Sequence, residues 1–307
     1  MSWDRDQERI ELRLGLVSSS LETGLVFPTP GPAVVTAGDA NTFSQLEALV
    51  APKTVIDHDW WGDLGSGTTS GAAPEATAGA APRPEAPVVL GRVQLGPIEA
   101  TTLQANDSAG LTQWLTENDY QLADSVTALL SGYVDRGWYF VVVKITGEVV
   151  LTGGIDPIRF TFRTEQLVYP MALSRAATDP QFVRLYVFDG HRARPGPLDA
   201  PAIELRADTS ATYWAGPTPV ELADRGTFLT ALNLTFEMPQ FQIPGDLAIV
   251  QASDDSAFAQ PDRHITEKVK FLGMPAGWAI ILGVVLALIA FRVVLHVVRQ
   301  RSDRLQE

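Results

Sequence analysis

The sequence predicts an α+β protein, with a mixed or mainly antiparallel sheet, short helices packed on it, and one C-terminal transmembrane helix. Three observations lead to this prediction. Strand, helix, helix and strand patterns follow one another between Val88 and Ile145. Short runs with a period of two, typical of half-buried strands, recur on both sides of that segment. An uncharged apolar run then extends from Pro275 to Phe291.

The N-terminal part begins with two predicted strands and a helix. Ile10 to Leu16 alternate between apolar and polar residues, and Leu25 to Phe27 form a second apolar run that prolines end. Asp39 or Asn41 is placed to cap a helix that ends before a proline. Its apolar stripe comprises Phe43, Leu46, Leu49 and Val50. Lys53 to Trp61 predict a further strand.

The stretch from Gly62 to Pro87 is rich in Gly, Ala, Pro and Thr. Such a composition buries little apolar surface, so we expect a mobile loop. It is either a linker between domains or an excursion inside one domain. We favour the excursion, because the predicted strands on both sides look like partners.

The segment from Val88 to Ile145 is the least ambiguous part of the chain. Gly96-Pro97 separates two alternating runs and predicts a turn between strands. Cap-type residues at 106–108 precede a short helix. Asp124 or Ser125 caps a second helix, and Gly137 is placed to end it in a left-handed conformation. The β-branched and aromatic run that follows, to Ile145, predicts a central strand covered on both faces.

The rest of the globular region is predicted from shorter patterns. We expect a hairpin from Pro157–Phe162 and Gln166–Leu173, and a mostly irregular stretch with one helical turn from His191 to Asp224. Further strands are expected at Phe182–Phe188, Thr227–Phe236 and Leu247–Gln251.

The C-terminal region predicts a membrane anchor. Pro275 to Val298 would span roughly 36 Å as a helix, enough for a bilayer core of about 30 Å. Trp278 suits one interface, and Arg292 can reach the other. The expected organisation is a domain over residues 1–255 with the loop 62–87 inside it, a stalk over 256–273, a transmembrane helix over 274–298 that contacts the lipid bilayer, and a tail over 299–307.

Composition excludes several classes of function. The formal net charge is -13 and the isoelectric point is about 4.7, which argues against a nucleic-acid partner. Cysteine is absent, so disulfides, thiolate metal sites and cysteine nucleophiles are excluded. No metal-binding or nucleophile motif with a recognised spacing is present, and neither a cofactor nor a metal is expected.

Two small groups of residues are candidates for a functional site. Asp189 and His191 place a carboxylate beside an imidazole in a predicted loop, an arrangement that can serve acid–base catalysis. A surface histidine is the commoner explanation. Trp60 and Trp61 lie beside the Gly/Ala-rich stretch, where flat aromatic faces can stack on an apolar ligand.

Several distinctive blocks resemble a known family. They are LGPIEATTLQANDSAGLTQWLTENDY, LLSGYVDRGWYFVVVKI, DPIRFTFRTEQLVYPMALS and VRLYVFDGHR. With them the chain resembles bacterial membrane-anchored proteins grouped as domain-of-unknown-function family 2330. The resemblance implies an exported domain, often with a C-terminal membrane helix, and it implies no activity or catalytic residue. The chain lacks the family's signal peptide and cysteine-containing opening, so we expect an export signal upstream of Met1.

We therefore predict a membrane-anchored cell-envelope protein with a non-enzymatic binding or scaffolding role and a membrane or envelope protein as partner. The alternative is an envelope hydrolase with a loop site around Asp189 and His191. We expect a single-pass protein of the cytoplasmic membrane, with an extracytoplasmic domain and a cytoplasmic C-terminus. Basic residues are slightly more frequent after the apolar run than before it, which favours this orientation.

Overall fold

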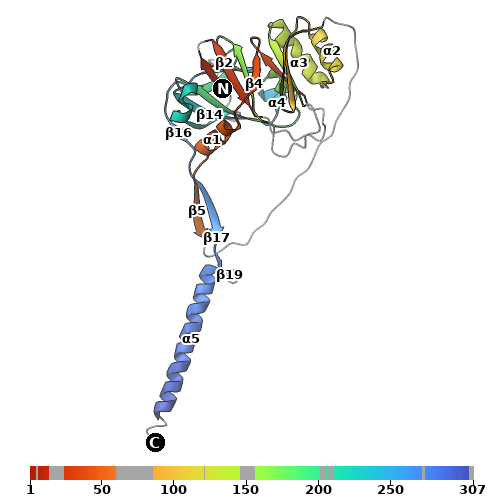
Figure 1. Cartoon of the computed structure of the whole chain (residues 1–307). Coiled ribbons are helices and arrows are strands. Elements are labelled where there is room, and N and C mark those ends of the chain that lie inside the picture. The colour runs from red at the N-terminus through yellow and green to blue at the C-terminus, as the bar shows by residue number, and fades with distance from the viewer. Residues whose placement is uncertain are drawn as a thin grey trace. The chain divides into compact units, whose positions relative to one another are not determined.

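The computed structural model describes residues 1–4, 6–13, 24–59, 86–120, 122–145, 156–200, 205, 210–271 and 274–303. The chain forms two compact units (Figure 1). The first comprises Met1–Ala51 and Ala76–Gln260, and the second comprises Pro52–Glu75 and Pro261–Glu307. The protein is α+β, with mostly antiparallel sheets and a few short helices, as the sequence predicts.

The largest element of the first unit is an eight-stranded sheet. It is antiparallel except for one parallel contact between β1 and β11. In spatial order its strands are β16 (Phe258–Ala259), β13 (Ser210–Pro217), β14 (Phe228–Phe236), β11 (Gln181–Asp189), β1 (Ser2–Asp4), β2 (Gln7–Leu12), β9 (Ile158–Arg163) and β4 (Val34–Ala37).

A four-stranded antiparallel sheet packs against one end of the large sheet. Its order is β3 (Gly24–Thr29), β8 (Tyr139–Ile145), β7 (Ile98–Gln104) and β6 (Val88–Leu95). The rings of Phe27 and Phe160, one from each sheet, stack with centroids 4.8 Å apart. The other face of the small sheet carries α2 (Ser108–Glu117) and α3 (Asp124–Asp135). Strand β8 is therefore buried on both faces, which confirms its predicted central position.

Local capping explains where the helices begin and end. Asp107 accepts hydrogen bonds from two backbone amides at the start of α2, as expected for an N-cap. The N-cap of α3 is Ala123 and makes no side-chain bond, so the prediction of Asp124 or Ser125 is wrong; Asp124 lies in the first turn instead. Gly137 follows the last turn with a φ of 70°, the left-handed conformation that was predicted.

A three-stranded sheet covers the face of β11 and β14 that points into the core. Its order is β10 (Leu167–Tyr169), β15 (Leu247–Gln251) and β12 (Ala193–Pro197). The short helices η1 (Ala172–Ala176) and α4 (Pro239–Gln242) complete this side. The outer face of β11 and β14 instead carries α1 (Ala40–Val50) and η2 (Val220–Arg225). This second face contains the candidate site.

Asp246, which precedes β15, joins these layers through one buried carboxylate. It accepts hydrogen bonds from the Tyr133 hydroxyl, from Nη2 of Arg136 at 2.7 Å, and from the backbone amides of Met171 and Ala172 at 2.9 and 3.0 Å. Arg136 also lies over the ring of Tyr133. A buried carboxylate needs such compensation, so this residue ties α3 and η1 to the three-stranded sheet.

The second unit contains a strand pair and a long helix. Strand β5 (Thr54–Asp59) pairs in parallel with β17 (Arg263–Lys268), as Figure 1 shows. Across this pair, Nδ1 of His264 lies 2.7 Å from Oδ2 of Asp57. A short antiparallel contact joins β18 (Lys270–Phe271) to β19 (Met274–Pro275), and α5 (Ala276–Asp303) follows. Within the described part of the chain, no helix combines the length and apolar character needed to span a membrane.

The topology corrects two predictions. Strands β9 and β10 belong to different sheets, so the expected hairpin from Pro157 to Leu173 is wrong. Strand β5 pairs with β17 and not with β6, so the strands flanking the Gly/Ala-rich stretch are not partners. Strand β17 lies within residues 256–273, the segment predicted to be a stalk.

The stretch from His191 to Pro219, predicted to be mostly loop, contains β12 and the whole of β13. Strand β12 reads ARPGP and pairs only with β15. Proline has no backbone N–H group. It is tolerated on an edge strand, because the hydrogen bond that it cannot donate would point away from the neighbouring strand. The predicted helical turn after this stretch is confirmed as η2.

Candidate functional site

The structure places Asp189 and His191 at the end of β11 but does not pair them. The Asp189 carboxylate accepts a hydrogen bond from the adjacent Gly190 amide at 2.7 Å. Nδ1 of His191 lies 2.8 Å from Oδ2 of Asp255, whose other oxygen accepts the Arg192 amide at 2.8 Å. The hydrogen bond with Asp255 raises the pKa of His191, and the same bond lowers the pKa of Asp255.

This arrangement is an exposed histidine–aspartate contact on a turn. The His191 side chain is 53% exposed, and neither Asp189 nor His191 lines any of the cavities described below. The imidazole therefore holds the segment after β15 against the start of β12. Trp60 and Trp61 lie outside the described residues.

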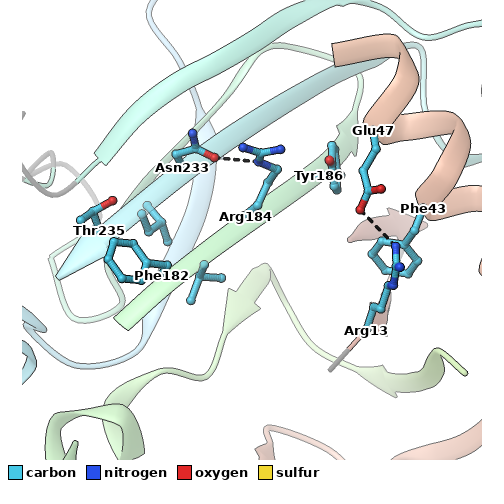
Figure 2. Close-up of a pocket in the computed structure, with 10 residues that line it drawn as sticks. Arg13, Phe43, Glu47, Phe182, Arg184, Tyr186, Asn233 and Thr235 are labelled. Atoms are coloured by element: carbon cyan, nitrogen blue, oxygen red, sulfur yellow. Dashed lines mark hydrogen bonds and ion pairs between the residues drawn. The ribbon is translucent and has the colours of Figure 1, made fainter. Parts of the chain in front are cut away.

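A groove lies at the edge of α1 on the outer face of the large sheet (Figure 2). Its volume is about 430 Å³. Residues from α1, β11, β14 and the end of β2 form it. The lining consists of Arg13, Phe43, Glu47, Phe182, Val183, Arg184, Tyr186, Asn233, Leu234 and Thr235. We call it the α1 groove.

The register of the large sheet builds one wall of the α1 groove. Successive side chains of a strand point to opposite faces, so Phe182, Arg184 and Tyr186 share the outer face of β11. Antiparallel pairing places Asn233 opposite Arg184 and Thr235 opposite Phe182. The aromatic and polar side chains of β11 therefore lie beside the polar side chains of Asn233 and Thr235 on β14.

Arg184 is held in place from two sides. Its Nε donates to Oδ1 of Asn233 at 2.8 Å, as the dashed line in Figure 2 shows. Its guanidinium carbon lies 4.2 Å from the ring centroid of Tyr213 on β13. The β13–β14 register shifts between Thr212 and Trp214, so Tyr213 occupies a bulge. Bulges redirect side chains, and this one accompanies the stacking of Tyr213 on the arginine.

Tyr186 lies deeper in the α1 groove and is only 7% exposed. Its hydroxyl has no hydrogen-bond partner of acceptable geometry within the described structure. Burial raises the pKa of Tyr186, while the nearby Arg184 guanidinium lowers it in part. A buried hydroxyl without a partner is uncommon, because the loss of its hydration costs free energy that a hydrogen bond normally offsets.

The opposite rim carries a paired charge. Nη1 of Arg13 lies 3.1 Å from Oε1 of Glu47, and both side chains are substantially exposed. Figure 2 shows this pair beside Phe43. The pair leaves Arg184 as the groove cation that has no carboxylate partner among the described residues.

A second cavity of about 620 Å³ adjoins the α1 groove. The two share six lining residues, including Arg184, Tyr186 and Phe182. Many of its other lining side chains are apolar, among them Leu25, Leu46 and residues of β3 and η1. The α1 groove therefore continues into a larger cavity that is lined by both apolar side chains and charged ones, among them Glu11 and Arg225.

Sequence reasoning missed the α1 groove. The FVRLYVF run was interpreted only as a strand, although its alternation puts Phe, Arg and Tyr on one face. An arginine on an otherwise apolar strand is the available signal. No group of three or more metal-ligating side chains of suitable arrangement occurs in the described ranges.

The comparisons identify a family and no individual relative. Residues 1–250 match the model of the family DUF2330, described as uncharacterized proteins conserved in bacteria. The chain belongs to this family, which confirms the resemblance found in the sequence blocks. No curated protein and no solved structure matches the chain.

Proposed function

We propose that this chain is a membrane-anchored cell-envelope protein whose first unit binds a ligand or partner without catalysis. The carrying observation is the exposed apolar surface of α5. Its large apolar residues are between 43% and 61% exposed from Ile280 to Val293. Consecutive residues 280–282 and 284–286 point in different directions around a helix, so the exposed surface has no polar side.

A water-exposed helix normally carries a polar face, whereas an apolar surface on all sides suits lipid. Together with the uncharged run from Pro275 to Phe291, this supports a lipid contact over residues 274–298. In the proposed orientation the first unit is extracytoplasmic and the C-terminus is cytoplasmic, in agreement with the basic residues after the run.

Membrane attachment is tested by carbonate extraction of membranes from cells that express the protein. The wild-type chain should stay in the membrane pellet. Changing both Leu282 and Leu286 to Lys should release it, because each charge near a helix centre costs about 2.5 to 3.5 kcal/mol on insertion. Phe271→Lys, outside the apolar run, is the control and should remain in the pellet. Release of the wild-type chain by carbonate would refute the proposal.

The orientation requires a separate measurement. Protease added to intact spheroplasts should digest the first unit and spare a tag placed after Glu307. Protection of the first unit would instead place it in the cytoplasm and contradict the exported orientation.

A binding role is favoured over the hydrolase by the geometry of the α1 groove. This groove offers hydrogen-bonding and aromatic groups that are held in place, as binding sites do. The hydrolase would need His191 to act with Asp189, yet each has a different hydrogen-bond partner. A membrane or envelope protein is the proposed partner, and co-purification of the detergent-solubilised chain with its neighbours tests this.

A further inference from the structure

We propose that the α1 groove binds the carboxylate of an apolar organic acid, with Arg184 as the anion-binding residue. The inference rests on the binding role proposed above and names the chemical class of the ligand. It is carried by the two fixed contacts of Arg184, by the buried hydroxyl of Tyr186, for which the described structure shows no hydrogen-bond acceptor, and by the exposed aromatic rings beside both.

Arg184 is prepared for an anion. Its Nε is engaged by Asn233 and its guanidinium stacks on Tyr213, so the side chain is already ordered before a ligand arrives. Within the described residues, no carboxylate engages the Nη groups, which form the fork that binds a carboxylate in bidentate geometry, and the guanidinium lies beside the Tyr186 hydroxyl. Ordering an arginine costs side-chain entropy, and a site that has already lost this entropy binds more tightly.

Tyr186 supplies a second donor. Its hydroxyl is buried, lines the α1 groove and lacks a hydrogen-bond partner in the described structure. A ligand oxygen that accepts this hydroxyl proton would satisfy the group. Arg184 and Tyr186 are two residues apart on one face of β11, so both donors can address one carboxylate group.

The apolar part of the ligand is inferred from the neighbouring surfaces. Phe182 is 69% exposed beside Arg184, although a large aromatic ring is usually covered. Phe43 faces the same groove from α1. The adjoining cavity of about 620 Å³ gives an apolar chain or ring room to continue.

The charge balance favours a carboxylate over a phosphate. One unpaired arginine matches a single negative charge, and the other groove arginine is neutralised by Glu47. A phosphate with nearly two negative charges would be repelled more strongly by the Glu47 carboxylate and by a chain whose net charge is -13.

The test uses four probes titrated calorimetrically into the full chain in a mild detergent. N-acetylphenylalanine represents the carboxyl end of a peptide, and 4-phenylbutyrate represents a free apolar acid. The corresponding neutral amides contain the same rings without the charge. We expect at least one acid to bind about tenfold or more tightly than its amide, the ratio that one charge-assisted hydrogen bond supplies. The tighter acid identifies the source of the carboxylate.

Variants assign the effect to the groove. Arg184→Gln should weaken binding of the acid by about tenfold or more and leave binding of the amide unchanged. Arg184→Lys, which keeps the charge but loses the fork, should weaken it less. Tyr186→Phe should also weaken binding of the acid and leave binding of the amide unchanged. Arg163→Gln is the matched control, because Arg163 is 77% exposed, is paired with Asp6 and lies outside the groove.

Three results would overturn the inference: equal affinity of each acid and its amide, no measurable binding of either acid, or unchanged affinity in Arg184→Gln. A melting curve equal to that of the wild type shows that this variant is folded. None of these results affects the carbonate and protease measurements, so a wrong ligand class is distinguishable from a wrong membrane assignment.

Discussion

Replacement of Asp246 by Ala should be among the most destabilising substitutions in the first unit. The side chain is fully buried and accepts four hydrogen bonds, from Tyr133, Arg136 and the amides of Met171 and Ala172. Truncation leaves the hydroxyl and both amides without an acceptor. Arg136 is 35% exposed and can regain water.

The expected magnitude follows from these donors. Each buried donor without a partner costs about 1 to 3 kcal/mol, and water entering the space left by the carboxylate satisfies some of them. We therefore expect a loss of about 3 to 5 kcal/mol, the range found when one partner of a buried ion pair is removed. Total stabilities of domains are about 5 to 15 kcal/mol, so the loss is a large fraction.

Urea denaturation of the full chain, followed by tryptophan fluorescence, measures this loss. Trp138 is a suitable probe because its ring packs 5.2 Å from that of Tyr133. Asp135→Ala is the matched control, since Asp135 is exposed at the end of α3, the helix that contains Tyr133. This substitution should change the free energy of unfolding by less than about 0.5 kcal/mol. If Asp246→Ala cost no more than this control, the carboxylate would not tie the layers together.

Three further predictions concern the core and two titrating groups. Leu130→Ala should cost about 2 to 5 kcal/mol because the side chain is fully buried, and Trp114→Ala should cost less because Trp114 is only half-buried; equal losses in urea denaturation would contradict the packing. Burial raises the pKa of Glu8 well above its usual value. The stability that protonated Glu8 contributes is therefore fully present below the unfolded-state pKa, near 4.5. It is lost as the pH rises through the folded-state pKa. Glu8→Gln should thus gain stability relative to wild type between pH 5 and pH 8, and a constant difference would refute this. Finally, NMR titration should give His191 a pKa above 6.5 that falls in Asp255→Asn; an unchanged value would show that the pair does not form.

Local chemistry made much of the fold predictable. Asp107 caps α2 through its own neighbours, and Gly137 ends α3 through its own φ angle, so both signals lie within a few residues. The continuous apolar run of β8 predicted burial on both faces, because a strand with one wet face would alternate. The order of the strands in the sheets was not predictable in this way. The pairing of β5 with β17 joins segments about two hundred residues apart, and no local pattern specifies such a partner.

The candidate site escaped prediction for the same reason. Arg13, Phe43, Arg184 and Asn233 are distant in the sequence, and only strand register and helix packing bring them together. The residues chosen from the sequence, Asp189 and His191, were neighbours along the chain. Strand β11 ends at Asp189, so the alternation of the strand does not extend to His191, and each side chain has its own partner.

The pairing of β5 with β17 determines whether one protease cut before α5 separates the chain into two free fragments. The segment between Gln251 and Arg263 is the last covalent link between the first unit and α5, and it is largely exposed. A cut there separates two fragments, one ending near β16 and the other beginning with β17. Strand β5 belongs to the first fragment and remains hydrogen-bonded to β17 over six residue pairs. Separation of the two fragments therefore requires dissociation of this strand pair, so cleavage of the chain and separation of its fragments are two distinct steps with separate rates.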